Sequence, residues 1–188
     1  MENTATQNIE HFVNGIDVSI LGETVQAVKD DASLGECQFR AKNTWIGGSK
    51  NMTSVQDYYG AGQEMEHKQT FVFQADEPPV LAGFDDAANP VEYLLHALAA
   101  CVTTSMVAHA AVRGIEIDEM SSTLEGDINL NGFLGIDPSL QKGFSEIRVK
   151  FEVKGNADAE QFKQLAEFSP VYKTITEGAN VVISVDKT

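Results

Sequence analysis

The amino-acid sequence predicts an α+β fold in which strands and helices occupy separate stretches of the chain. Apolar residues alternate with a period of two before residue 75 and again after residue 115, and this period is typical of strands. One long apolar helical pattern lies between these stretches, and shorter helical patterns follow the second one. Strands and helices that gather in separate runs indicate an α+β architecture.

Length and charge narrow the class of protein further. The chain has 188 residues, 43% of them hydrophobic, which suits one compact domain. Its formal net charge of −15 argues against nucleic acid or an anionic membrane surface as a partner. No apolar run approaches the roughly 18 residues of a membrane span, and acidic residues interrupt the start of the chain, where a signal peptide is apolar. We therefore expect a cytoplasmic protein with no membrane partner.

Residues 1–35 are expected to form a helical extension, and residues 36–188 a single domain. The first eight residues are polar and are interpreted as a frayed terminus. Apolar residues then recur at helical spacing between residues 17 and 31, namely Ile20, Leu21, Val25 and Val28. They predict a short amphipathic helix.

The domain is expected to begin with an antiparallel meander. One face of the stretch 37–45 carries Cys37, Phe39, Ala41, Asn43 and Trp45. This alternation predicts a half-buried strand with Cys37 in the core. Two further strands are expected near 53–59 and 67–74, separated by a glycine-containing turn at residues 60–62.

A long helix is predicted from Pro90 to Arg113. Asn89 can cap it, proline suits its first position, Glu92 can complete a capping box, and Gly114 can end it. Almost every residue between these signals is apolar, so we expect the helix to be buried nearly all round. A domain of this size cannot easily surround such a helix, which favours a second subunit as part of its cover.

The remaining chain alternates between strand and helix signals. Strands are expected around Leu124 to Leu130 and over 147–153, and a loop over 132–143 lies between them. A helix is expected over about 157–168, and Ser169-Pro170 predicts the cap and first residue of a short helix. The stretch 181–185 predicts a closing strand.

Cys101, in the middle of the long helix, is the residue most able to carry chemistry. It can equally be a small buried hydrophobe, which is the commoner role of a free cysteine. A mid-helix thiolate receives no help from the helix dipole and needs a cation from another segment. His96 and His109 are 5 and 8 positions away, offsets of roughly 140° and 80° around the helix, so neither forms a cysteine–histidine pair by local geometry.

Metal and nucleotide chemistry are not expected. The sequence contains no His-Glu-x-x-His, paired Cys-x-x-Cys, P-loop or dinucleotide fingerprint. His67 lies among charged residues that are better explained as a solvated strand. We therefore predict no cofactor and no metal.

Three segments together resemble the OsmC/Ohr family of osmotically inducible and organic hydroperoxide resistance proteins. They are the run from Asn89-Pro90 to Cys101, the run Ser169-Pro170-Val-Tyr-Lys-Thr174, and the closing stretch 180–185. The resemblance covers about residues 36–187. It implies the OsmC-like fold, in which antiparallel sheets wrap a long buried central helix, and an intertwined homodimer with active sites at the subunit interface.

The resemblance also implies a reaction. In active members, one cysteine on the long helix attacks an organic hydroperoxide, a second cysteine resolves the product as a disulfide, and an external dithiol restores the enzyme. An arginine and a glutamate hold the reactive sulfur as a thiolate. Cys101 matches the helix cysteine.

Several other positions depart from the family pattern. The second cysteine falls on Ser169, which cannot form a disulfide but is well suited to cap a helix. The arginine falls near Ser49, with Lys50 beside it, and Arg40 is an alternative cation. For the acid, the candidates are Asp76 and Glu77.

These departures leave more than one function open. The first is a one-cysteine thiol peroxidase acting on organic or lipid hydroperoxides with an external thiol reductant. The second is a non-catalytic protein that keeps an apolar pocket and binds a small apolar ligand. A purely structural dimer is the third.

Overall fold

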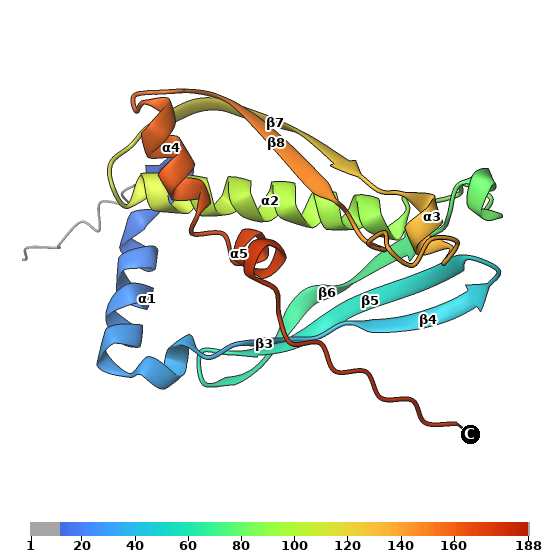
Figure 1. Ribbon diagram of the computed structural model, residues 1–188. Helices are drawn as coiled ribbons and strands as arrows, with labels where there is room; N and C mark the ends of the chain where they lie inside the picture. Colours follow the sequence, from blue (N-terminus) through green and yellow to red (C-terminus); the bar gives the residue numbers. More distant parts are fainter. Residues whose placement is uncertain (1–11, 188) are drawn as a thin grey trace, which may run out of the picture. The chain divides into compact units, whose positions relative to one another are not determined.

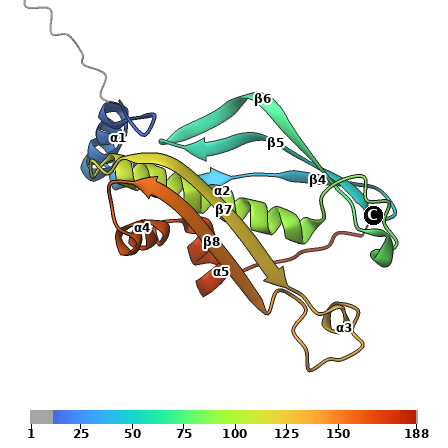
Figure 2. The same ribbon diagram turned by 90° about the horizontal axis from the view of Figure 1, so that it is seen from above.

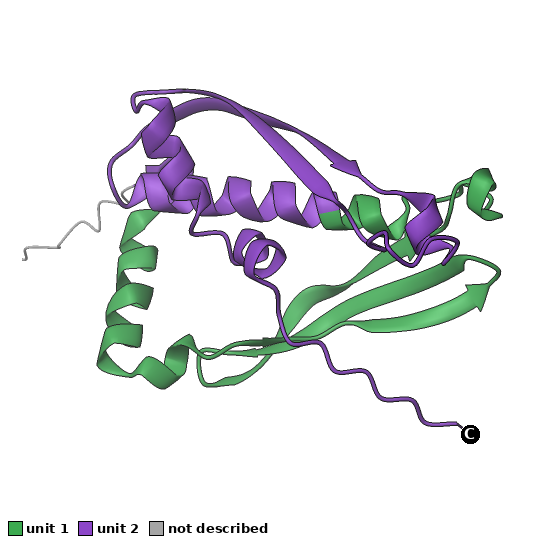
Figure 3. Ribbon diagram, in the orientation of Figure 1, with its two compact units in different colours: residues 1–11, 17–94 green, residues 12–16, 95–188 purple. Residues whose placement is uncertain are grey.

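The structure is a computed structural model that describes residues 12–187 (Figure 1). The predicted frayed terminus therefore lies outside the described residues. The chain divides into two compact units (Figure 3): unit 1 contains Asp17–Leu94, and unit 2 contains Phe12–Ile16 and the chain from Leu95 onward. The boundary falls inside the long helix α2, Pro90–Ala111. Each unit is described by itself.

Unit 1 begins with the predicted amphipathic helix, which is confirmed as α1, Val18–Asp30. The Asp17 carboxylate caps it by accepting hydrogen bonds from the backbone N–H groups of Ser19 and Ile20. A short 3₁₀ helix, η1, follows at Ala32–Gly35. No residue of α1 is buried, so its apolar side is open to contact.

The meander is confirmed as an antiparallel sheet. It contains β3 (Gln38–Phe39), β4 (Lys42–Gly47), β5 (Lys50–Gly60) and β6 (Gln63–Ala75). Strand β5 is central, with β3 and β4 paired along it and β6 as its other partner. Ala61 and Gly62 both have positive φ in the β5–β6 turn, the backbone that a tight hairpin needs.

The expected half-buried strand over 37–45 is wrong in two respects. It is divided into β3 and β4, and its apolar face is open: Phe39 is 77% and Trp45 72% exposed, and Cys37 is exposed as well. The alternation correctly predicts extended backbone. It cannot say what covers the apolar face, and no described side chain does so.

Helix α2 begins as the sequence predicts. Asn89 Oδ1 accepts a hydrogen bond of 2.8 Å from Val91 N, and the Glu92 carboxylate accepts one of 2.9 Å from Asn89 N. The helix ends at Ala111, two residues earlier than expected. Gly114 has φ +67°, and Ile115 N donates to Ala110 O, the pattern of a glycine-terminated helix.

Burial of α2 is much less than the sequence led us to expect. Five of its 22 residues are buried, namely Leu98, Val102, Met106, Ala110 and Ala111. By length and composition the helix is also able to cross a membrane, which corrects the expectation that no stretch of the chain reaches that length. The exposed remainder of this helix needs a cover that the described chain does not provide.

Unit 2 places its core on the buried stripe of α2. Phe162 and Leu165 pack on this stripe, together with partly buried residues of two paired strands, β7 (Ile117–Asp127) and β8 (Glu146–Gly155). The two strands run alongside α2 in both views (Figures 1 and 2). The short helix α3 (Leu130–Phe133) lies in their connection, where the sequence predicts a strand end and a loop.

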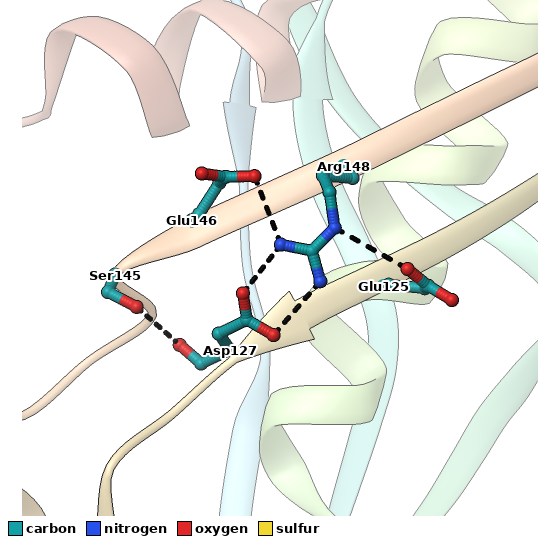
Figure 4. A network of polar contacts seen from close by, with 5 residues as sticks. All are labelled: Glu125, Asp127, Ser145, Glu146 and Arg148. Atoms are coloured by element: carbon teal, nitrogen blue, oxygen red, sulfur yellow. Dashed lines mark hydrogen bonds and ion pairs between the residues drawn. The ribbon is translucent and has the colours of Figure 1, made fainter.

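Two short helices follow β8. Helix α4 (Ala159–Ala166) is capped by Asp158, and α5 (Pro170–Glu177) by Ser169, which confirms both predicted helices. At the far end of the hairpin, Arg148 binds the carboxylates of Glu125, Asp127 and Glu146 (Figure 4). This network is solvent-exposed.

The predicted closing strand over 181–185 is wrong for the chain as described. Residues 179–187, here called the C-terminal segment, lie in no strand and pair with none of the described strands. Their four large apolar side chains are 78–84% exposed: Val181, Val182, Ile183 and Val185. A strand needs a partner for its backbone, and none is supplied here. The α+β class with antiparallel sheets is otherwise confirmed.

Candidate functional site

Unit 1 gathers several predicted site residues around one buried carboxylate. Asp76 directly follows β6 and is 1% exposed. Its Oδ1 accepts hydrogen bonds from Ser49 Oγ (2.6 Å) and Glu77 N (2.9 Å), and its Oδ2 accepts from Phe84 N (3.1 Å) and Asp86 N (3.2 Å). The carboxylate therefore organises residues 76–89, here called the Asp76 loop.

The backbone of this loop requires particular conformations. Ala82 and Asp85 both have φ of +61°, in the left-handed region that residues other than glycine and asparagine seldom adopt. A Cβ atom on Gly83 would lie 1.7 Å from the carbonyl oxygen of Glu77. The loop folds tightly because its amides converge on Asp76 and because glycine occupies the closest approach.

The hydrogen bonds to Asp76 stabilise its charged form. The Ser49 hydroxyl is the largest influence, and three backbone N–H groups add to it, so the pKa of Asp76 is lowered from 3.8 to about 2 although burial opposes the shift. Asp76 is therefore a fixed anion at neutral pH. It is suited to orienting its neighbours and not to transferring protons.

Lys50 is held at the edge of the same cluster. Its ammonium group forms an ion pair with Asp86 and lies 4.7 Å from the centroid of the Phe84 ring. The hydrogen bond to Asp86 is the main reason why the pKa of Lys50 is raised. The position of this cation thus depends on the Asp76 loop, which carries both of its neighbours.

Glu77 connects the loop to the start of α2. Its Oε2 accepts a hydrogen bond of 2.8 Å from Asn89 Nδ2, and Asn89 caps the helix. The structure therefore brings Ser49, Lys50, Asp76 and Glu77 into one cluster. Asp86 and Phe84 belong to it as well, and sequence reasoning missed both; the only signal was the Asp85-Asp86 pair in a loop before a well-capped helix.

Arg40, the alternative cation, lies outside this cluster. Its guanidinium donates to Asp57 (2.8 Å) and to both carboxylate oxygens of Glu64 (2.6 and 2.9 Å). Two carboxylates therefore already occupy this group. Hydrogen bonding to Arg40 is also the main reason why the pKa of Glu64 is lowered.

Cys101 lies in unit 2, in the middle of α2, as a half-buried free thiol. The nearby histidine at position 109 is already engaged: its ring stacks on Phe168 at 4.0 Å, and its Nδ1 lies 3.1 Å from Arg113 Nη1. Burial first, and then the Arg113 charge, lower the pKa of His109. No group of metal-ligating side chains occurs within residues 12–187.

Ser169, which the family resemblance matched to the second cysteine, is fully buried. Its Oγ accepts a hydrogen bond of 3.1 Å from Tyr172 N at the start of α5. This confirms Ser169 as a helix cap. Unit 2 thus contains the thiol and this hydroxyl, whereas unit 1 contains the cations and carboxylates.

The chain matches one protein-family model. The family model described as OsmC-like protein matches residues 83–184. A search of curated protein sequences returned no match.

Solved structures with the same fold come from several bacteria. An osmotic stress induced and detoxification response protein from Psychrobacter arcticus shares 19% identity, with a TM-score of 0.54 over 73% of this chain and 88% of that chain. An OsmC-like protein from Mycoplasma pneumoniae shares 17% identity, with a TM-score of 0.53 over 73% of this chain and 86% of that chain. At these identities the likeness concerns the fold.

The matched segment includes the last part of the Asp76 loop, the whole of α2 with Cys101, and the buried serine that caps α5. A single apolar helix of this kind is weak evidence for a membrane span. The chain belongs to the OsmC-like protein family.

Proposed function

We propose that the protein reduces organic hydroperoxides through Cys101 as a one-cysteine thiol peroxidase. The observation that carries the proposal is the half-buried free thiol on the central helix of an OsmC-like domain, 11 residues after the proline that starts this helix. Membership of the family supports a stress-related role for the chain at the family level.

The reaction balances with one external dithiol. The Cys101 thiolate attacks a peroxide oxygen, the O–O bond breaks, and the alcohol leaves with a proton, so that the cysteine becomes a sulfenic acid. One thiol of the reductant condenses with this sulfenic acid and releases water. Its second thiol then attacks the mixed disulfide and restores Cys101. An external thiol is needed because the Ser169 hydroxyl cannot form a disulfide with the oxidised Cys101.

Lys50 is the better candidate for the cation that a mid-helix thiolate requires. Arg40 already shares its guanidinium between two carboxylates, whereas Lys50 has one partner, the largely exposed Asp86. A single surface ion pair is easily exchanged for another anion. In this proposal Glu77 positions the start of α2 through Asn89, and Ser169 positions α5.

A homodimer accompanies the proposal. Large apolar side chains remain open on α2, on the sheet of unit 1 and on the C-terminal segment. Apolar surface of this extent is typical of a buried interface, and closed two-fold dimers are the commonest solution.

The direct test uses the other cysteine as an internal control. Purified protein treated with cumene hydroperoxide should form a sulfenic acid on Cys101, trapped with dimedone and located by mass spectrometry, while the exposed Cys37 reacts far less. Peroxide consumption with a dithiol should be lost in Cys101→Ser, retained in Cys37→Ser, and slowed in Lys50→Met. Equal labelling of both cysteines, or activity in Cys101→Ser, contradicts the proposal.

A second candidate function is the non-catalytic binding of a small apolar ligand. It is favoured by an apolar cavity within unit 2. This function does not need the thiol, so ligand binding should persist in Cys101→Ser.

A further inference from the structure

Unit 2 has a partly open cavity of about 490 Å³ beside the central helix. Leu98, Val102 and Met106 of α2 form one wall, and all three are nearly inaccessible to solvent. Strand β8 lines it with Val149, Phe151 and Val153 on a single face. The cavity is therefore bounded by regular elements that pack against each other, and it does not arise from a mobile loop.

Small side chains on the helical side keep this space open. Ala157, Ala159 and Ala166 line the cavity at and within α4, next to the buried ring of Phe162. Protein interiors are normally packed with few voids larger than a water molecule, and a water molecule occupies roughly 30 Å³. This cavity is partly open to solvent and its volume lies in the range of ligand sites.

Three polar side chains lie at the cavity: Lys163 in α4, Glu167 at the C-cap of α4, and Tyr172 in α5. None of the ion pairs among the described residues uses Lys163. The pKa of Lys173 is raised mainly by Glu177 and to a smaller degree by Glu167, so Glu167 already has a cation near it. Lys163 is solvent-exposed and is the cation of the cavity lining that can pair with an added anion, and the Tyr172 hydroxyl adds a hydrogen-bond donor.

We propose that this cavity binds a carboxylic acid with a medium-length hydrocarbon chain. The chain lies between α2 and β8, and the carboxylate is held by Lys163 and Tyr172. This inference rests on the second candidate function and gives it a site and a ligand class. Cys101 does not line the cavity, so binding is independent of peroxide chemistry.

Dodecanoate is the probe for the first experiment, which uses the full-length protein and isothermal titration calorimetry. We expect saturable binding of one molecule per chain with a Kd on the order of 10 μM. Ala166→Phe fills the cavity and should weaken binding at least about tenfold. Gln164→Phe adds the same ring to the exposed side of α4, outside the lining, and should leave binding unchanged. Ala159→Leu is the smaller filling variant and should weaken binding in the same direction.

The pairing of the ligand headgroup with Lys163 is tested by changing the charge of either one. Lys163→Gln should weaken dodecanoate at least about tenfold and leave dodecanol unaffected, because only the carboxylate pairs with the lysine. Equal affinity for dodecanoate and dodecanol in the unaltered protein overturns the role of Lys163. Preference for dodecylammonium overturns it as well and assigns the headgroup to Glu167.

Failure of this inference is distinguishable from failure of the peroxidase proposal. Cys101→Ser should bind dodecanoate with unchanged affinity, whatever its peroxidase activity. Absence of saturable binding to the folded protein overturns the inference. If no probe binds and Ala166→Phe dissociates the homodimer, the occupant of the cavity is a second copy of the chain. This result also overturns the inference.

Discussion

The Asp76 loop and the C-terminal segment both lie outside the long helices and strands, yet they are organised in opposite ways. The loop carries four acidic residues among prolines, alanines and a glycine, and four hydrogen bonds converge on its buried Asp76 carboxylate. The C-terminal segment is apolar and β-forming in sequence, but its side chains are open to solvent and it pairs with no described strand.

The difference shows that a segment adopts a fixed conformation only where hydrogen-bond partners for it are available. Three of the four donors to Asp76 come from its own loop, and the fourth, Ser49, comes from the turn before β5. The loop can therefore form within one chain. The C-terminal segment has a strand's sequence but no partner among the described residues, so we expect its order to depend on the second subunit of the proposed homodimer.

The strongest way to break the loop is to remove the charge of Asp76. Asp76→Asn replaces one acceptor oxygen by an NH₂ group that faces at least one backbone N–H donor in either orientation of the amide, and buried donors left without acceptors are strongly destabilising. We expect the Tm to fall by roughly 5–10 °C in thermal unfolding followed by circular dichroism. Asp85→Asn is the matched control, since Asp85 is a solvent-exposed carboxylate of the same loop, and it should change the Tm by less than about 2 °C. Equal losses would refute the role of the Asp76 carboxylate.

Acid should reveal the same interaction. Because the folded-state pKa of Asp76 is about 2 against an ordinary 3.8, its ionisation contributes stability that is fully present above about pH 4 and is lost as the pH falls toward 2. Other carboxylates also titrate in this range, so the useful quantity is the difference in Tm between the unaltered protein and Asp76→Asn. This difference should narrow between pH 4 and pH 2. A difference that stays constant means that Asp76 has no lowered pKa.

The C-terminal segment should respond in oligomeric state. Ile183→Pro removes a backbone donor and cannot lie in the middle of a paired strand, so we expect the dimer dissociation constant to rise at least about tenfold in a sedimentation dilution series. Ile183→Thr keeps a β-branched residue and should stay within about threefold of the unaltered protein. An unchanged dimer in the proline variant would place the interface elsewhere.

The smallest effect is expected at the exposed network on the β7–β8 hairpin. Arg148 binds three carboxylates there, which raise its pKa, with Asp127 the largest influence. Exposed ion pairs contribute little and are screened by salt. Arg148→Gln should lower the Tm by no more than about 2 °C, and 1 M NaCl should reduce the loss further. Lys150→Gln, which removes one exposed pair with Glu152, is the control.

Local signals predicted the parts of the fold that depend on local contacts. The Asn89–Glu92 capping box, the Ser169 cap and the paired strand over 147–153 all have their main determinants within a few residues. The exposed face of β3 and β4 and the unpaired segment at 181–185 could not be predicted, because alternation shows an extended backbone without showing its cover.

The candidate site divides in the same way. The Ser169 cap is a local signal that the structure confirms, whereas the site roles of Cys101 and Ser169 came from the family resemblance and stay predictions. The grouping of Lys50 with Asp86 and Phe84 depends on how residues 76–89 turn back on themselves, and this follows from the hydrogen bonds to Asp76. Nothing in the neighbouring sequence marks Phe84 as a contact of Lys50.

Gly83 has a practical consequence for anyone who alters the loop. Even an alanine methyl group there meets a carbonyl oxygen at 1.7 Å, and that oxygen belongs to the backbone, which cannot rotate away as a side chain can. A library randomised at this codon and selected for folded protein should return glycine alone, whereas its neighbour Phe84 should accept other large side chains. Mutational tolerance along the segment should thus change abruptly between adjacent codons.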